Sequence, residues 1–323
     1  MLTTRRFLPA AVAIALALPC AAAQRDTYPQ RPVRIIVNVA PGGGVDAVAR
    51  IAAQHYQAVL GQPFIVDNRT GGGGSIANEL VAKAAPDGYT ILCTSSTIVT
   101  NAAVRPQGYD PVRDFQAIVM LTAAPYLVVT TPSLPVSSVK DLIAFAQSKP
   151  GALSFASAGN GSIVHMGAEL LVAMSGTKML HVPYKGVSEA YPAVIAGDVN
   201  WMIGFPISAL PLVKAGRLKA IAITSATRSK LLPEYPTVAE SGIPGYEVRG
   251  WFGMLAPARV PTDVIAKLNA EAKRAFQAPD VVQRVSRDGA DVVANSPEEF
   301  SKEVRAEFAK WRELVKRQGM KVE

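Results

Sequence analysis

The sequence predicts an α/β protein of two lobes, each a mainly parallel sheet flanked by helices, joined by a hinge of two crossing strands. Its 323 residues indicate two domains at roughly 150 residues per domain. Short apolar segments alternate with longer amphipathic ones, which is the pattern of parallel strands covered by helices. The alternation occurs in two series, and a final helical stretch must return to one of them.

The first series starts at Val33 and reads β-α-β-α-β. Strands are expected at 33–39, 64–66 and 90–93, and helices at 46–60 and 76–84. The second series opens with a strand at 126–129. It continues with strands at 153–156, 179–182, 201–203 and 220–223 and helices at 139–147, 163–174, 188–196 and 209–215.

The end of the chain is expected to pack on the first series. A strand at 251–256 precedes helices at 262–276 and 296–318, and Ser296 with Glu299 forms a capping box at the start of the last helix. The apolar stripe of that helix needs a surface to cover, so the chain should cross between lobes near residues 125 and 249. The predicted lobes are 24–124 with 249–323, and 125–248, with a ligand bound between them.

Composition excludes several classes of protein. Apolar residues make up 49% and charged residues 18%, so a disordered chain is excluded. The net charge of +8 comes from scattered basic residues with no basic run interleaved with aromatics, so we expect no nucleic-acid partner. A mild positive charge suits anionic solutes.

Residues 1–23 are expected to be a signal peptide. Arg5 and Arg6 precede an apolar run from Phe7 to Leu18, and three alanines end at Ala23. We therefore predict cleavage near Ala23 and export to the periplasm, with the arginine pair weakly favouring a twin-arginine route. The residues before Cys20 fit a lipoprotein cleavage site poorly. The mature chain keeps only Cys93 and so cannot form an internal disulfide.

The segment Pro41-Gly42-Gly43-Gly44-Val45-Asp46 joins a strand to a helix and is typical of an anion-binding loop, because its backbone can approach a ligand at a helix N-terminus. It also satisfies a dinucleotide-binding pattern, with Asp67 at the end of the next strand. An exported protein argues against that alternative, and we expect no cofactor. Asp46 is expected to cap the helix in preference to contacting the ligand.

Three further strand-to-helix connections carry small or polar residues. Thr70 to Ser75 holds four glycines, read either as a second anion loop or as a flexible turn. Ser157 to Ser162 offers hydroxyls and an amide, with His165 one turn later as a ligand contact or a buried core histidine. In the corner 181–186, Tyr184 could pack on a ligand, whereas Lys185 is expected on the surface.

Catalytic and metal motifs are weak or missing. A serine hydrolase using Ser162 or Ser75 with His165 is the alternative enzyme class, but Gly73-Gly74-Ser75-Ile76-Ala77 lacks the last glycine of a nucleophile elbow. The chain has no His-Glu-x-x-His, paired cysteines or phosphate loop. A binding protein with no bound metal fits better than an enzyme.

Seven ordered motifs together resemble the Bug family of extracytoplasmic solute receptors. They are Pro41 to Asp46, Val66 to Arg69, Ala85 to Tyr89, Tyr109 to Phe115, Ser157 to Ser162, His181 to Gly186 and Leu232 to Glu240. The match spans nearly the whole mature chain. It implies a periplasmic-binding-protein fold that closes like a Venus flytrap on a small carboxylate and delivers it to the membrane permease subunits of a tripartite tricarboxylate transporter. A sensor that passes its signal to a membrane partner stays an open alternative.

The resemblance also implies the ligand-binding residues. The loops at 41–46 and 70–76 hold one carboxylate, and the other lobe sets specificity. The predicted set is Val39, Pro41, Gly42, Gly43, Gly44, Asp46, Gly72, Gly73, Gly74, Ser75, Ser95, Ser157, Asn160, Gly161, Ser162, His165, Tyr184, Gly204 and Phe205.

Two positions depart from the family pattern. Asn38-Val39-Ala40 stands where the family often has Pro followed by an aromatic, and Gly204 stands where Asp is frequent. Both changes are expected to enlarge or neutralise the pocket. We therefore expect a ligand without an ammonium group, either an aliphatic di- or tricarboxylate or an aromatic acid.

Overall fold

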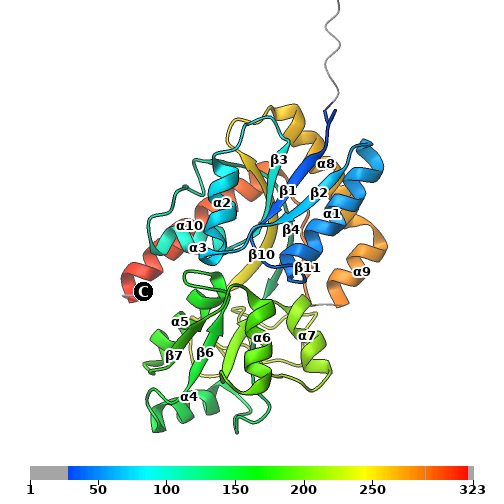
Figure 1. The fold of residues 1–323 in the computed structure, drawn as a ribbon. Helices are drawn as coiled ribbons and strands as arrows, with labels where there is room; N and C mark the ends of the chain where they lie inside the picture. The colour runs from blue at the N-terminus through cyan, green and yellow to red at the C-terminus, as the bar shows by residue number, and fades with distance from the viewer. Residues whose placement is uncertain (1–27, 288, 319–323) are drawn as a thin grey trace, which may run out of the picture.

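The computed structural model describes residues 28–287 and 289–318, and it places them in two lobes (Figure 1). Each lobe has one sheet, of six strands in the upper lobe of the view and of five in the lower. The predicted signal peptide, with Arg5, Arg6, Cys20 and Ala23, lies outside the described residues.

The element bounds follow the predicted alternation. The strands are β1 Val33–Val37, β2 Phe64–Asn68, β3 Thr90–Ser95, β4 Phe115–Pro125, β5 Leu127–Thr130, β6 Ser154–Ser157, β7 Leu180–Pro183, β8 Trp201–Gly204, β9 Lys219–Ile223, β10 Arg249–Pro257 and β11 Asp291–Val292. The helices are α1 Gly44–Leu60, α2 Ser75–Ala82, α3 Thr97–Val104, α4 Val139–Ser148, α5 Ile163–Ser175, α6 Val187–Ala196, α7 Pro206–Lys214, α8 Thr262–Gln277, α9 Pro279–Arg287 and α10 Pro297–Gln318, with a short 3-10 turn, η1, at Gly72–Gly74.

The sheets are mixed, which corrects the expectation of mainly parallel sheets. In the upper sheet, ordered β11-β4-β10-β3-β1-β2, the strands β1, β2 and β3 are parallel, whereas β10 pairs antiparallel with both β3 and β4. In the lower sheet, ordered β7-β6-β8-β5-β9, the strands β6, β7 and β8 are parallel and β5 pairs antiparallel with β8 and β9. The antiparallel strands are those next to the chain crossings.

The chain passes between the sheets at two places that lie side by side. Strand β4 runs into β5 at Tyr126, and β10 starts at Arg249, which pairs with Pro125. Thr224 ties the two passages together, because its Oγ1 accepts a hydrogen bond from Tyr126 N–H at 2.7 Å and donates to Val248 O at 2.6 Å. We call the part with the upper sheet lobe 1 and the part with the lower sheet lobe 2; the boundaries at 124/125 and 248/249 stay predictions.

The last helix returns to lobe 1. Helix α10 packs on α3 and β4, and its Phe300 is fully buried beneath Gly253 of β10. The Trp251 and Phe300 rings meet edge to face with centroids 4.9 Å apart. The apolar stripe therefore covers the crossing strand as well as the sheet.

Sequence patterns missed β4, α3, α9 and β11. Strand β4 is buried along most of its length, so it shows no alternation. Helix α3 buries Thr97, Thr100 and Asn101, polar residues that hide its inward face from a hydrophobicity pattern. Among the described residues, no helix combines the length and apolar character needed to cross a bilayer.

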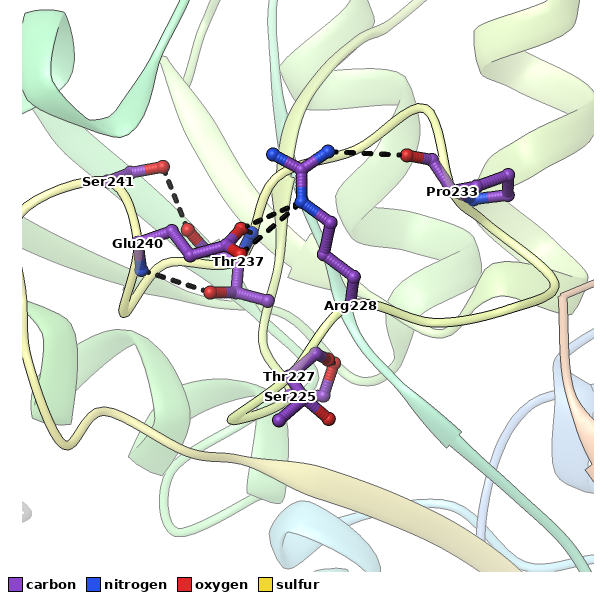
Figure 2. Close-up of polar contacts among 7 residues, drawn as sticks. All are labelled: Ser225, Thr227, Arg228, Pro233, Thr237, Glu240 and Ser241. Atoms are coloured by element: carbon purple, nitrogen blue, oxygen red, sulfur yellow. Dashed lines mark hydrogen bonds and ion pairs between the residues drawn. The ribbon is translucent and has the colours of Figure 1, made fainter.

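The connection between β9 and β10 is folded back on itself (Figure 2). Thr237 N–H donates to Glu240 Oε2 and Glu240 N–H donates to Thr237 Oγ1, both at 3.0 Å, and Arg228 Nε lies 3.0 Å from the same carboxylate. The Thr237 N–H first, and then Arg228, hold the pKa of Glu240 below its usual range. A bridge from Thr237 to Ile223 attaches this motif to the sheet. The second passage between lobes is thus anchored in lobe 2.

Candidate functional site

Six connections lead from the carboxyl end of a parallel strand into a helix. In lobe 1, β1, β2 and β3 lead to α1, α2 and α3, and in lobe 2, β6, β7 and β8 lead to α5, α6 and α7. Carboxyl ends of parallel strands meet at one edge of a sheet, which is where open α/β folds bind ligands. Each of these edges therefore offers unpaired backbone N–H groups and the positive ends of helix dipoles.

The two edges face each other across the lobe boundary. A Cβ built on Gly73 would lie 2.7 Å from the backbone oxygen of Asn160, and one built on Gly44 would lie 2.8 Å from the Ile207 side chain. Glycine is therefore required at both positions for the lobes to approach this closely. The structure brings the predicted loops of the two lobes together.

Asp46 holds the first loop. It lies in the first turn of α1, is 4% exposed, and accepts hydrogen bonds at 3.0 Å from Gly42 N–H, from Arg50 and from Asn68 Nδ2. Burial raises its pKa, but the hydrogen bonds from Arg50, Gly42 and Asn68 outweigh burial and lower the pKa below its usual value. Both carboxylate oxygens are engaged within the loop. The expectation that Asp46 caps the helix is wrong, because Gly43 is the N-cap residue and Asp46, in the first turn of α1, accepts the N–H of Gly42 before the helix. Asn68 Nδ2 also binds Val39 O at 3.0 Å.

The rest of this loop is backbone. Pro41 and Gly42 are exposed, while Gly43 and Gly44 are buried at the start of α1. Gly42 adopts φ +86°, where a side chain would be strained. Gly43 is the N-cap residue and supplies no side-chain cap, so the first N–H groups of α1 have no side-chain acceptor there.

The second loop depends on its glycines. Gly71 to Gly74 all have positive φ, from +58° to +119°, so they are a required turn and not interchangeable flexible residues. Ser75 Oγ donates to Gly72 O at 2.9 Å, and Asn101 Nδ2 of α3 donates to Gly73 O at 2.7 Å. The loop is therefore held from within and from the neighbouring helix.

The start of α3 contributes a direct hydrogen bond between lobes. Ile163 N–H, at the start of α5, donates to Thr97 Oγ1 at 3.2 Å. Ser95 Oγ, another predicted ligand group, accepts from Thr97 N–H at 3.3 Å. Thr97 was not among the predicted residues, and only its place directly after a strand hinted at it.

In lobe 2, Ser162 caps α5. Its Oγ accepts from His165 N–H at 3.2 Å, and Gly161 N–H donates to His165 Nδ1 at 3.1 Å. His165 is 2% exposed and its Nε2 lies 3.6 Å from Glu169 Oε1. The buried-histidine alternative describes this geometry, because the ring is held by its own loop and helix.

Ser157 is paired with a histidine that the sequence analysis did not select. Ser157 Oγ lies 2.6 Å from His181 Nε2 and accepts from Gly159 N–H at 3.1 Å. Burial, with the nearby His165, lowers the pKa of His181 to about 3, so His181 is neutral at physiological pH. The signal that could have found it was parallel pairing of 154–157 with 180–183, in which Ser157 lies opposite Pro183, two residues beyond His181 and on the same face of the sheet.

The expectation that Gly204 enlarges the pocket is wrong. A Cβ at Gly204 would lie 2.3 Å from the Tyr191 hydroxyl, so a tyrosine fills the space beside it, and that hydroxyl is 3.1 Å from Ser208 Oγ. Phe205 is buried and stacks on Phe252 of lobe 1, with centroids 4.0 Å apart. Gly204 is thus packed against a side chain of its own lobe, and Phe205 lies in the contact between lobes.

A cavity of about 450 Å³ opens where the loops meet. Its wall includes Gly71 to Gly73 from lobe 1 and Gly159, Asn160 and Tyr184 from lobe 2. The predicted residues Gly72, Gly73, Asn160 and Tyr184 are thus placed on one cavity, while Asp46, His165, Gly204 and Phe205 support the surrounding structure.

A family model described as tripartite tricarboxylate transporter family receptor matches residues 48–320. The chain belongs to this family. The matched range includes every strand of the two sheets except β1, and five of the six converging connections in full.

Three solved structures are similar to this receptor over nearly its whole length, each with a TM-score of 0.86. The periplasmic binding protein BugD is 33% identical over 91% of this chain and 99% of its own. A protein of R. palustris solved with adipate is 35% identical over 90% of this chain and 98% of its own, and MatC of Rhodopseudomonas palustris, solved with malate, is 32% identical over 89% and 100%. The two-lobed fold and the resemblance to Bug receptors are confirmed.

As a member of the tripartite tricarboxylate transporter receptor family, the chain is a periplasmic solute-binding receptor and not an enzyme. The geometry agrees, since Ser162 Oγ and His165 Nδ1 each accept a backbone N–H and do not bind each other. Asp67, which a dinucleotide ribose would require, is instead bound by Arg34 at 2.6 Å and by Arg69 at 2.9 Å.

No group of three His, Cys, Asp or Glu side chains within 28–287 and 289–318 is arranged to hold a metal ion in this receptor. Cys93 is a buried free thiol, and burial raises its pKa.

Proposed function

We propose that this receptor captures a small organic carboxylate in the cleft between its lobes and delivers it to the membrane permease subunits of a tripartite tricarboxylate-type transporter. The observation that supports this proposal is that six strand-to-helix connections converge on one region between the lobes. Each exposed helix N-terminus stabilises an anion by about 0.3 to 1 kcal/mol, and by up to about 2 when partly buried.

The loops at the two facing sheet edges are the proposed ligand contacts. The backbone of Pro41 to Gly44 and of Gly72 to Ser75 binds one carboxylate from lobe 1, and Ser157, Asn160, Gly161 and Tyr184 contact the ligand from lobe 2. Micromolar affinity requires about −8 kcal/mol, which several helix termini and direct hydrogen bonds can supply without a metal. The relatives solved with adipate and malate support a carboxylate.

We infer in addition that the precursor is exported and cleaved near Ala23. The low-charge apolar run after Arg6 supports this, and so does membership of a periplasmic family. Mass spectrometry of the protein recovered from periplasm tests it, since a chain that begins near Gln24 is expected and an intact Met1 would contradict it.

Thermal unfolding tests the ligand class. The mature protein, freed of bound solute, is heated with aliphatic di- and tricarboxylates, aromatic acids, amino acids and NAD. A ligand at 100 times its dissociation constant adds about 2.7 kcal/mol, enough for a shift of several degrees in midpoint. Stabilisation by carboxylates and not by amino acids is expected, and stabilisation by NAD alone would overturn the proposal.

A further inference from the structure

Two basic side chains, one from each lobe, line the cavity between the loops. Arg105 follows α3 in lobe 1, and Lys185 lies in the β7–α6 connection of lobe 2. The sequence predicts Lys185 on the surface, and Lys185 is exposed. The exposed region on which it lies is the wall of this cavity. We propose that Arg105 and Lys185 form a second anion subsite that binds the distal carboxylate of a dianionic ligand.

The charged side chains of the cavity wall keep a net positive charge. Among the described residues, no carboxylate forms an ion pair with Arg105 or Lys185. Other arginine and lysine side chains of the surface do have a carboxylate partner. Glu189 of α6 is the acidic side chain in the wall, so the three charged groups sum to one positive charge. The charge of Arg105 also reaches the Tyr109 hydroxyl, where it opposes the rise in pKa that burial causes.

The cavity wall places these cations beside the proposed carboxylate site. Gly71 to Gly73 form part of the same wall, and this loop belongs to the connection that binds the first carboxylate. A ligand with one carboxylate on the loop therefore extends its other end toward Arg105 and Lys185. A monocarboxylate leaves both cations without a partner.

The same arrangement couples ligand charge to closure. Arg105 and Lys185 belong to different lobes, and the wall includes the close contact in which a Cβ on Gly159 would lie 3.2 Å from Gly73 Cα. Closing the lobes brings two like charges to one cavity, which is unfavourable until an anion lies between them. A dianion thus stabilises the closed form more than a monoanion does.

This inference rests on the proposed function and extends it to a ligand class. The test uses the exported, mature protein and titration calorimetry with two matched pairs, adipate with hexanoate and succinate with butanoate. We expect each dicarboxylate that binds to bind more tightly than its monocarboxylate partner. Each of Arg105→Gln and Lys185→Gln should weaken dicarboxylate binding by about two- to fivefold, the upper range of a partly exposed charge pair, and leave monocarboxylate binding unchanged.

Two further variants test the direction of the charge effect and provide a control. Glu189→Gln should strengthen dicarboxylate binding, because it removes the negative charge from the wall. Lys140→Gln should change nothing, since Lys140 is exposed on α4, at the end of lobe 2 away from lobe 1 (Figure 1). Added salt should weaken adipate binding more than hexanoate binding.

The outcomes separate the two proposals. Equal loss of mono- and dicarboxylate binding in Arg105→Gln and Lys185→Gln, or unchanged dicarboxylate binding in both, overturns the subsite while carboxylate binding itself stands. Monocarboxylates bound as tightly as dicarboxylates by the natural protein overturn it as well. Binding of no carboxylate at all overturns the proposed function and the subsite together.

Discussion

His165 and His181 lie face to face, with ring centroids 3.8 Å apart and planes inclined by 18°. Phe155 extends the stack on the His181 side, 5.1 Å away. Two imidazoles at this distance cannot both be charged without strong repulsion, and the low pKa of His181 reflects its burial and this neighbour. The stack lies directly below the Ser157 to Ser162 loop, so its protonation affects the wall of the cleft.

The first prediction is that His181 makes the protein sensitive to acid. Its pKa is about 3 in the folded protein, against an ordinary 6.5. As pH falls below 6.5, His181 binds a proton in the unfolded chain but not in the folded protein. The free energy of unfolding therefore declines until the pH approaches 3. His181→Gln, which keeps a group able to bind Ser157, should show a smaller loss of urea midpoint between pH 7 and 4.5.

The matched control for His181 is His55→Gln, on α1 in the other lobe, where His55 Nε2 pairs with Glu271 at 3.2 Å. An unchanged acid dependence in His181→Gln would show that other groups cause it.

Glu307 predicts the opposite pH dependence. Its carboxyl group is enclosed beside Trp251, at a cavity of about 440 Å³ between β10 and α10, and burial raises its pKa to about 7 despite hydrogen bonds from Trp251 and Trp311. The folded protein therefore binds a proton between the ordinary value of 4.5 and pH 7 that the unfolded chain has released. Stability contributed by this protonated form is lost as pH rises through 7.

Glu307→Gln should remove this loss and raise the urea midpoint at pH 8, since glutamine keeps an acceptor for the Trp251 N–H. Glu303→Gln, on the same helix, serves as the comparison. Equal midpoints for Glu307→Gln and the natural protein at pH 8 would contradict the assignment.

Gly204 predicts a steric coupling with Tyr191. Gly204→Ala should destabilise the protein by about 1 to 3 kcal/mol, the usual cost of overpacking, because its Cβ would meet the tyrosine hydroxyl. Tyr191→Phe removes that oxygen and one hydrogen bond, which costs about 0.5 to 1.5 kcal/mol. The double variant should be more stable than the sum of the single effects, measured by urea unfolding, and simple additivity would show that the contact is relieved elsewhere.

The hydrogen bond from Ile163 N–H to Thr97 Oγ1 predicts a role in closure. Thr97→Val keeps the shape and removes the acceptor, so the closed, ligand-bound form should lose about 0.5 to 1.5 kcal/mol. We expect weaker binding of whichever carboxylate the thermal screen identifies, mainly through faster dissociation. Thr100→Val is the control, because the hydrogen bond that Thr100 Oγ1 makes among the described residues stays within α3, to Thr97 O at 3.2 Å. Equal effects of both variants would assign the loss to α3 itself.

Much of the architecture could be predicted from sequence because local signals carried it. The strand expected at 33–39 is Val33–Val37, and the helix expected at 163–174 is Ile163–Ser175. The glycine loops were also found, since the four successive positive φ angles at Gly71 to Gly74 strongly favour glycine.

The remaining site features depend on contacts between distant residues. Tyr191 fills the space beside Gly204, His181 binds Ser157, and Thr97 receives the N–H of Ile163. None of these partners is adjacent in sequence, and a hydrophobic period gives no information about which side chain enters a gap. The same reason placed Lys185 on an open surface, since Arg105 lies eighty residues earlier in the chain.

Strand β10 lies between β3 and β4 in the upper sheet. Its residues, 249–257, are synthesised after all of lobe 2. Until then β3 and β4 lack the strand that lies between them and joins the first three strands to β4. Lobe 2 lies within one continuous segment and has no such gap. A chain threaded across a membrane from its N-terminus would thus present lobe 1 with its central strand missing, and the receptor could become competent to bind solute only after release.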